Sequence, residues 1–192
     1  MEFRVAGDDA ERIAELHAQS WRRTYRGMMR DEFLDGPVVA NRLDAWQKRL
    51  SENLVDRWVY LATDGSQLVG FICVFGNEDP IWGSYIDNLH VSADYHRRGI
   101  GAVLMGHAAA WLGARYPGSG VYLWVMMANE SARRFYERLG ATDAGTIIKC
   151  DPGGGHAPNC RYVWRDPAAL RQHATEWMPG TTPQIDFRRS SA

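Results

Sequence analysis

Residues 96–102 form a basic turn with two glycines, followed by an amphipathic segment. Gly99 and Gly101 allow the backbone to approach a ligand closely. The amides at the start of a helix have no acceptor within the helix, and the helix dipole favours negative charge there. Arg97 and Arg98 add fixed positive charge beside those amides. The pattern therefore predicts a phosphate or pyrophosphate site.

The two general phosphate-binding motifs do not account for this turn. The chain contains no Gly-x4-Gly-Lys-Ser/Thr sequence. A dinucleotide-binding turn would need a third glycine where Leu104 stands. It would also need an acidic residue about 20 positions later, where residues 126–129 read Met-Met-Ala-Asn. The alternative is a turn that serves chain geometry alone.

Residues 96–102, after a segment that ends Leu89-His90-Val91, resemble the acyl-CoA pyrophosphate loop of the GNAT superfamily of N-acetyltransferases. That loop reads Gln or Arg, two residues, Gly, one residue, then Gly or Ala, and His96 departs from it at the first position. Residues 129–141 are similar to a second family segment, Asn-x-x-Ala-x-x-Phe-Tyr-x-x-x-Gly. The resemblance implies a mixed α/β fold, a mostly antiparallel central sheet flanked by helices, and acetyl-CoA as co-substrate.

The resemblance also implies roles for particular residues. The strand that ends at Val91 separates from the next strand in the sheet, and the pantetheine arm binds the exposed backbone of Leu89 and Val91. A main-chain amide near Leu89 polarises the thioester carbonyl. Asn129 contacts the cofactor at the start of its helix. The pyrophosphate is held by the main chain of Arg97, Arg98, Gly99, Ile100, Gly101 and Ala102.

Tyr136 is the expected general acid. A departing thiolate has a conjugate acid with a pKa of about 8.5, and a phenol with a pKa of about 10 can protonate it. The alternative is that Tyr136 belongs to the apolar stripe that contains Ala132, Phe135 and Leu139. The family match favours catalysis, and Tyr136 is also expected to contact the cofactor.

The general base is expected to be Asp87. Alternation along a strand places Asp87 on the same face as Leu89 and Val91. The alternative is an exposed or salt-bridged carboxylate. His90 points to the other face and is a weaker candidate, and His17, on the first helix, is expected to be a boundary residue and not a catalyst.

The acceptor is expected to contact four aromatic residues, Trp21, Tyr25, Trp82 and Tyr85. Aromatic faces bind alkylammonium groups, so a cationic amine is the favoured acceptor. The alternative for Trp21 is packing in the core. Cys150, His156 and Cys160 are irregularly spaced and lack a fourth partner, so no metal site is expected.

Hydrophobic periodicity and turn residues predict a mixed order of elements. Asp8 is expected to cap the first helix, and Gly36-Pro37 should break the second. The predicted elements are strand 2–6, helix 8–22, helix 30–50, strands 58–62 and 67–75, strand 82–91, helix 99–112, strand 121–127, helix 129–139, strands 146–150 and 161–164, and helix 166–176.

Length and composition limit the class of protein. The 192 residues fit one domain, placed at residues 1–178, with a polar tail at residues 179–192. Lys and Arg number 22 and Asp and Glu number 23, a balance that does not favour nucleic-acid binding. Three separated cysteines, and a sequence without a signal peptide or membrane span, predict a cytoplasmic protein. A homodimer is an open alternative.

The expected function is N-acetyl transfer from acetyl-CoA to the primary amine of a small molecule, by direct attack in a ternary complex. No Ser or Cys stands in a recognisable nucleophile setting, so no covalent enzyme intermediate is expected. Two alternatives stay open. One is a non-catalytic acyl-CoA sensor, and the other is acetylation of a protein or peptide.

Overall fold

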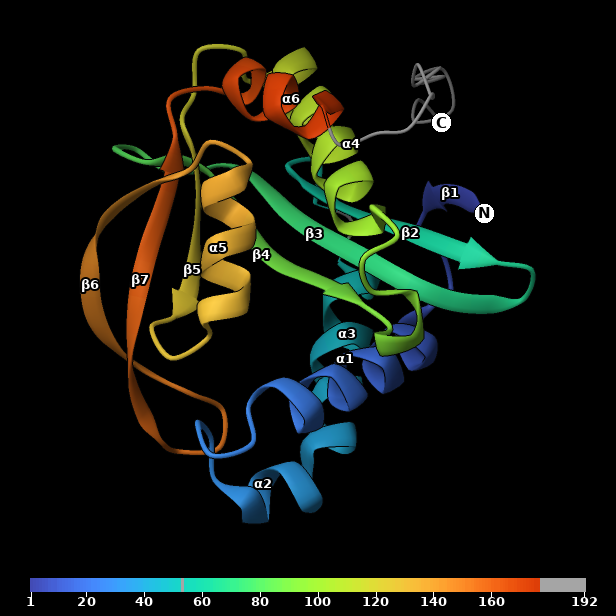
Figure 1. Cartoon of the computed structure of the whole chain (residues 1–192). Coiled ribbons are helices and arrows are strands. Elements are labelled where there is room, and N and C mark those ends of the chain that lie inside the picture. The colour runs from blue at the N-terminus through green and yellow to red at the C-terminus, as the bar shows by residue number, and fades with distance from the viewer. Residues whose placement is uncertain (53, 177–192) are drawn as a thin grey trace.

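A computed structural model describes residues 1–52 and 54–176. Seven strands form one sheet in the order β1-β2-β3-β4-β5-β7-β6 (Figure 1). The strands are β1 (Glu2–Val5), β2 (Arg57–Asp64), β3 (Gln67–Asp79), β4 (Gly83–Val91), β5 (Val121–Met126), β6 (Thr142–Cys150) and β7 (His156–Trp164). The helices are α1 (Ala10–Thr24), α2 (Asp31–Asp35), α3 (Val38–Ser51), α4 (Ile100–Arg115), α5 (Glu130–Arg138) and α6 (Pro167–Glu176), with a 3-10 turn η1 (Ala93–Tyr95).

The sheet separates two hydrophobic layers. Along β3, Ile72 and Val74 pack into the cluster covered by α4, α5 and α6. Their neighbours Phe71 and Cys73 pack into the cluster formed with α1 and α3. This alternation is expected for a strand buried on both faces. Each face of the sheet therefore meets its own set of helices.

The mixed, mostly antiparallel sheet confirms the predicted fold class. Among the described strands, β4 and β5 form the one parallel pair, and every other neighbouring pair is antiparallel. The predicted break at Gly36-Pro37 separates α2 from α3. The β6–β7 hairpin extends further than its two predicted strands. The predicted tail at residues 179–192 lies outside the described residues.

The start of α1 differs from the predicted capping box. Asp9, not Asp8, occupies the N-cap position, and its side chain does not cap the helix. Its carboxylate instead binds the Arg4 guanidinium through two 2.7 Å hydrogen bonds and the Arg12 guanidinium through one of 2.9 Å. The hydrogen bonds from Arg4 lower the pKa of Asp9 from its ordinary value of 3.8 to about 2. This ion-pair cluster ties β1 to α1.

Replacing Asp9 by asparagine is expected to lower the free energy of unfolding by about 1–2 kcal/mol near neutral pH, because both arginines are partly solvated. The folded-state pKa lies below the unfolded value. The stabilisation is therefore present above pH ~4 and is lost as the pH falls towards about 2. Urea unfolding across this range measures it, with the exposed neighbour Asp8→Asn as control. If the difference in the free energy of unfolding between Asp9→Asn and wild type does not become smaller as the pH falls, the assignment is contradicted.

Among the residues described, no helix combines the length and the apolar character needed to cross a bilayer.

Candidate active site

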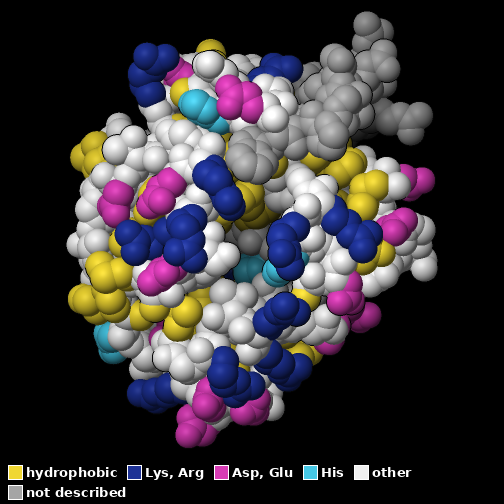
Figure 2. Space-filling model, viewed as in Figure 1, with side chains coloured by type: hydrophobic (Ala, Val, Ile, Leu, Met, Phe, Trp, Pro, Cys, Tyr) yellow, Lys and Arg dark blue, Asp and Glu magenta, His cyan; other side chains and the backbone are white. Residues whose placement is uncertain are grey.

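The strands β4 and β5 part near the middle of the molecule. They pair over three positions, from Ser84↔Val121 to Ile86↔Leu123. Beyond Leu123, β5 pairs with β7 alone in the described part of the chain, while β4 continues to Val91 next to β3. Figure 1 shows the two strands diverging, and Figure 2 shows a hollow on this side of the molecule with Lys and Arg side chains around its rim.

Leu89 and Val91 lie on the part of β4 that has separated from β5, as their expected role requires. The Val91 carbonyl accepts a hydrogen bond from His96 Nε2 at 2.9 Å, with the imidazole as donor. A carbonyl oxygen has a second lone pair, so this contact leaves room for one more donor. The departure at His96 thus has a structural role, because the imidazole binds the end of β4.

The glycine turn opens α4 in the predicted manner. Gly99 is the N-cap residue at φ +80°, and Arg97 also has a positive φ of +62°. Backbone that alternates into the left-handed region turns successive amides towards one concave surface, which suits an anion. Arg97 and Arg98 are exposed beside it, and the Arg98 guanidinium lies 4.7 Å from the centre of the Tyr95 ring. The amides of Ile100, Gly101 and Ala102 form the first turn of α4, where helix geometry supplies no backbone acceptor.

Tyr136, Asn129 and Tyr25 come together from α5 and the end of α1. Asn129 caps α5 by accepting a hydrogen bond from the Ala132 amide at 3.2 Å. The Tyr25 hydroxyl hydrogen-bonds to the Asn129 side chain, and Tyr25 also acts electrostatically on Tyr136. Burial raises the pKa of both phenols. The structure therefore joins a predicted acceptor residue to two predicted cofactor residues.

Asp87 does not share a face with Leu89 and Val91, so that expectation was wrong. Cys73 of β3 pairs with Asn88, while Val74 pairs with Ile86, which leaves Asp87 as an extra residue in a β-bulge. The bulge resets the alternation of side chains. The Asp87 carboxylate binds Arg49 of α3 at 2.8 Å and hydrogen-bonds to the Tyr85 hydroxyl. Asp87 thus lies on the α3 side of the sheet, whereas Tyr136 packs on the α4 side.

The two histidines considered as bases are buried and neutral. Trp46 Nε1 donates to His17 Nδ1 at 3.0 Å, and Ser20 Oγ lies 2.8 Å from His90 Nδ1. Burial lowers the pKa of His90 to about 3 and that of His17 well below its ordinary value. An imidazole with so low a pKa is a poor acceptor for a proton from an alkylammonium, whose pKa is about 10. His90 does lie on the α1 side, opposite Leu89, as predicted.

The remaining predicted acceptor residues lie apart from one another. Trp21 is 8% exposed and packs with α2, and the Arg42 guanidinium covers its ring at 4.3 Å. Trp82 carries the Arg161 guanidinium at 4.2 Å. Tyr85 stacks on Tyr122 at 5.0 Å beside Asp87. Two of the rings expected to bind an alkylammonium therefore already carry guanidinium groups of the protein.

Sequence reasoning missed the cationic side chains on the α3 side of the sheet. Arg42 and Arg49 stand two helical turns apart in α3, and Lys149 and Arg161 lie on β6 and β7. The sequence could have indicated Arg42 and Arg49, since a spacing of two turns on a predicted helix places both side chains on one face. It could not have indicated Lys149 and Arg161, because their position depends on how β7 pairs with β5.

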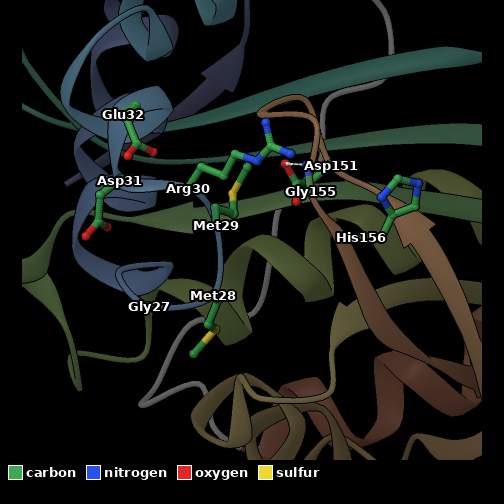
Figure 3. Close-up of a pocket in the computed structure, with 9 residues that line it drawn as sticks. All are labelled: Gly27, Met28, Met29, Arg30, Asp31, Glu32, Asp151, Gly155 and His156. Atoms are coloured by element: carbon green, nitrogen blue, oxygen red, sulfur yellow. Dashed lines mark hydrogen bonds between the residues drawn. The ribbon is translucent and has the colours of Figure 1, made fainter.

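A second hollow, with a volume of about 340 Å³, lies between the α1–α2 loop and the β6–β7 loop (Figure 3). Asp151 Oδ1 accepts hydrogen bonds from the Gly153 and Gly155 amides at 2.8 and 3.2 Å. Figure 3 shows Arg30 extending towards Asp151, with His156 on the far side of the loop. The hollow is open and carries both signs of charge.

Comparison with known proteins agrees with this geometry. Residues 10–141 match the family model described as the acetyltransferase (GNAT) family. The Mycobacterium tuberculosis protein named "Probable N-acetyltransferase Rv2775" is 28% identical over 162 residues, covering 80% of this chain and 87% of that protein. PaiA N-acetyltransferase from Thermoplasma acidophilum, solved in complex with coenzyme A, has a TM-score of 0.61 at 21% identity, covering 85% and 100% of the two chains. Arabidopsis thaliana NAA60, solved with a bisubstrate analogue, has a TM-score of 0.63 at 21% identity, covering 85% and 96%.

Since the family match spans more than half of the sequence, this chain belongs to the GNAT family of acetyltransferases, with acetyl-CoA as co-substrate. The resemblance carried by residues 96–102 and 129–141 is thereby confirmed.

Proposed function

We propose that this protein transfers the acetyl group of acetyl-CoA to the primary amine of a small molecule, by direct attack in a ternary complex. The observation that carries the proposal is the placement of the anion-binding turn at Gly99 next to the separation of β4 from β5 after Ile86. The turn suits a diphosphate, and the unpaired edge of β4 suits an extended amide-bearing chain. Leu89 and Val91 supply that edge.

The chain's own groups suit the proton transfers. The amine nitrogen forms a bond to the acetyl carbon as the carbon–sulfur bond breaks, and the electron pair of that bond goes to sulfur. Tyr136 donates its phenolic proton to this sulfur. Burial raises the pKa of Tyr136, so the phenol remains protonated near neutral pH. Asp87, held by Arg49 and Tyr85, accepts the proton that the amine releases on the α3 side.

The cysteines support direct attack. Cys73 and Cys160 are buried, and burial raises the pKa of Cys73 to about 12, which leaves its thiol protonated. A nucleophilic cysteine needs the opposite shift. Cys150 is exposed at the far end of β6, in the hairpin beside His156.

Amine-dependent release of CoA tests the proposal. Purified protein, acetyl-CoA and a panel of primary amines are incubated, and CoA and the acetylated amine are measured by chromatography and mass spectrometry. Chromatography is preferred to thiol-reactive dyes because Cys150 is exposed. We expect stoichiometric CoA and N-acetyl product with at least one small amine. Tight CoA binding without release by any amine would instead indicate a sensor, and release only with peptides would indicate a peptide acetyltransferase.

A further inference from the structure

Four cationic side chains on the α3 side of the sheet interact electrostatically with Asp87 or with one another. Arg42 and Arg49 come from α3, Arg161 from β7 and Lys149 from β6. Trp124 joins the strand residues, because the Arg161 guanidinium lies 4.4 Å and Lys149 Nζ 4.9 Å from the centre of its ring. Arg49 and Asp87 act electrostatically on Arg42, and Arg161 and Asp87 act on Lys149. These residues, Arg42, Arg49, Lys149 and Arg161, are called the cation cluster below.

The cation cluster is short of negative charge. Asp87 forms an ion pair with Arg49 at 2.8 Å. For Arg42, Lys149 and Arg161, no carboxylate of the described residues lies within ion-pair distance. Arg161 Nε is buried and has no hydrogen-bond partner among those residues. Partial burial lowers the pKa of Arg42 to about 10 and also lowers that of Lys149. Such desolvated cations are stabilised when an anion binds between them.

Aromatic rings hold the cations in place. The Arg161 guanidinium lies between Trp82 and Trp124, at 4.2 and 4.4 Å from the two ring centres. Two flanking rings restrict the orientation of the guanidinium, and a guanidinium matches the geometry of a carboxylate or a phosphate. Lys149 stands over the Trp124 ring as a second charge. An arginine ordered in this way is better suited to binding an anion than to solvation.

The cation cluster adjoins the place where β4 and β5 separate. Trp124 follows Leu123, the last residue of β5 that pairs with β4, and Asp87 follows Ile86, its partner on β4. Asp87 binds the cation cluster through Arg49, and Asp79, at the end of β3, interacts electrostatically with Arg161. An ammonium group next to Asp87 would therefore have positive charge around the rest of its molecule. A zwitterionic ligand fits such a site, because its ammonium group can bind Asp87 while its anionic group binds the cation cluster.

We propose that the cation cluster binds an anionic group of the acceptor, so that the acceptor is a small primary amine that also carries a carboxylate or a phosphate. This inference rests on the proposed acetyl transfer and names the class of acceptor for it. Asp87 receives the ammonium end, and Arg161, with Lys149 and Arg42, receives the anionic end. The assignment replaces the cationic acceptor that the aromatic residues alone had suggested.

Matched pairs of amines test this assignment. Glycine and β-alanine are compared with their amides, and O-phosphoethanolamine with ethanolamine, in the CoA-release assay. We expect the anionic member of at least one pair to have a KM about 10-fold lower than its neutral partner. Carboxylate and phosphate pairs are read separately, so the favoured anion is identified. A preference for neutral or dicationic amines would overturn the assignment.

Variants of Arg161 locate the site. Arg161→Gln is expected to raise KM for the anionic amine about 10-fold, with kcat and the KM for its neutral partner little changed. Arg161→Lys should restore part of the loss, and Arg165→Gln, an exposed arginine beside Asp166, is the matched control. Thermal unfolding confirms that each variant folds. An unchanged KM in Arg161→Gln would overturn the assignment.

Direct binding separates this inference from the proposed function. The N-acetylated form of the preferred anionic amine is titrated into the protein without CoA, by calorimetry. If no amine releases CoA, N-acetylglycine and inorganic phosphate serve as ligands instead. Binding that Arg161→Gln weakens supports the anion site even where acetyl transfer has failed. No heat from any of these ligands, together with efficient acetylation of neutral amines, rejects the anion site and leaves the acetyltransferase intact.

Discussion

Replacing Tyr136 by phenylalanine is expected to lower kcat about 100-fold, the lower range of what a positioned general acid contributes. The phenylalanine ring keeps the contacts of Tyr136 with Phe135, Tyr162 and Trp164 and removes only the hydroxyl. Affinity for CoA should therefore stay within about twofold of wild type, because the lost hydroxyl acts on the departing sulfur in the transition state and not on bound CoA. Steady-state kinetics and calorimetry with CoA measure the two quantities.

A matched substitution separates this chemistry from packing. Tyr60 is a half-buried tyrosine on β2 whose hydroxyl makes one long contact of 3.4 Å with the Phe3 carbonyl. Tyr60→Phe should leave kcat unchanged. A kcat for Tyr136→Phe that equals the wild-type value would show that another group protonates the sulfur, and the Tyr25 phenol, which interacts electrostatically with Tyr136, is a candidate. An equal loss in both variants would attribute the effect to stability.

The geometry of the turn at Gly99 was predictable because its signal is local. Gly99 adopts a positive φ that glycine tolerates, the helix begins at the next residue, and the two arginines flank it in sequence. The same holds for Asn129, whose capping role depends on the amide three residues ahead. Such features need only a short stretch of chain, so the sequence pattern contains them.

The position of Asp87 was not predictable, since it depends on pairing between strands. Alternation along β4 holds only while each residue has one partner on β3, and the bulge opposite Cys73 and Val74 adds a residue to β4 alone. No residue type near Asp87 marks that insertion. The bulge moves the carboxylate to the α3 side, where Arg49 binds it. A one-residue slip is enough to exchange the faces of a strand.

The surroundings of the predicted acceptor residues also depend on distant contacts. Trp21 and Trp82 suggested affinity for cations, which is a sound inference for bare aromatic faces. In the fold, Arg42 covers Trp21 and Arg161 covers Trp82. A ring that already holds a guanidinium presents positive charge to a ligand. The sequence identified these aromatic residues, and only the tertiary contacts show that two of them already carry guanidinium groups.

Replacing Gly99, in the turn before α4, by valine is expected to weaken the binding of CoA. A β-branched residue at φ +80° is strained by roughly 1–2 kcal/mol, and relief of that strain rotates the amides that follow. Loss of one charge-assisted hydrogen bond adds about 1.5–3 kcal/mol. The Kd for CoA should therefore rise at least about 60-fold, since each 1.4 kcal/mol is about tenfold in affinity. Calorimetry with CoA at low ionic strength measures it.

Gly145→Val supplies the control for backbone strain. Gly145 on β6 has φ +108°, and a Cβ built there meets no atom within 4 Å, so the substitution strains the chain without filling space. Both variants should show a similar decrease in the free energy of unfolding measured in urea, but only Gly99→Val should show a decrease in affinity for CoA. Wild-type affinity in Gly99→Val would mean that the diphosphate binds elsewhere. Gly99→Val should also bind inorganic pyrophosphate more weakly than wild type, because the affected donors are the ones expected to bind the diphosphate and not the thioester.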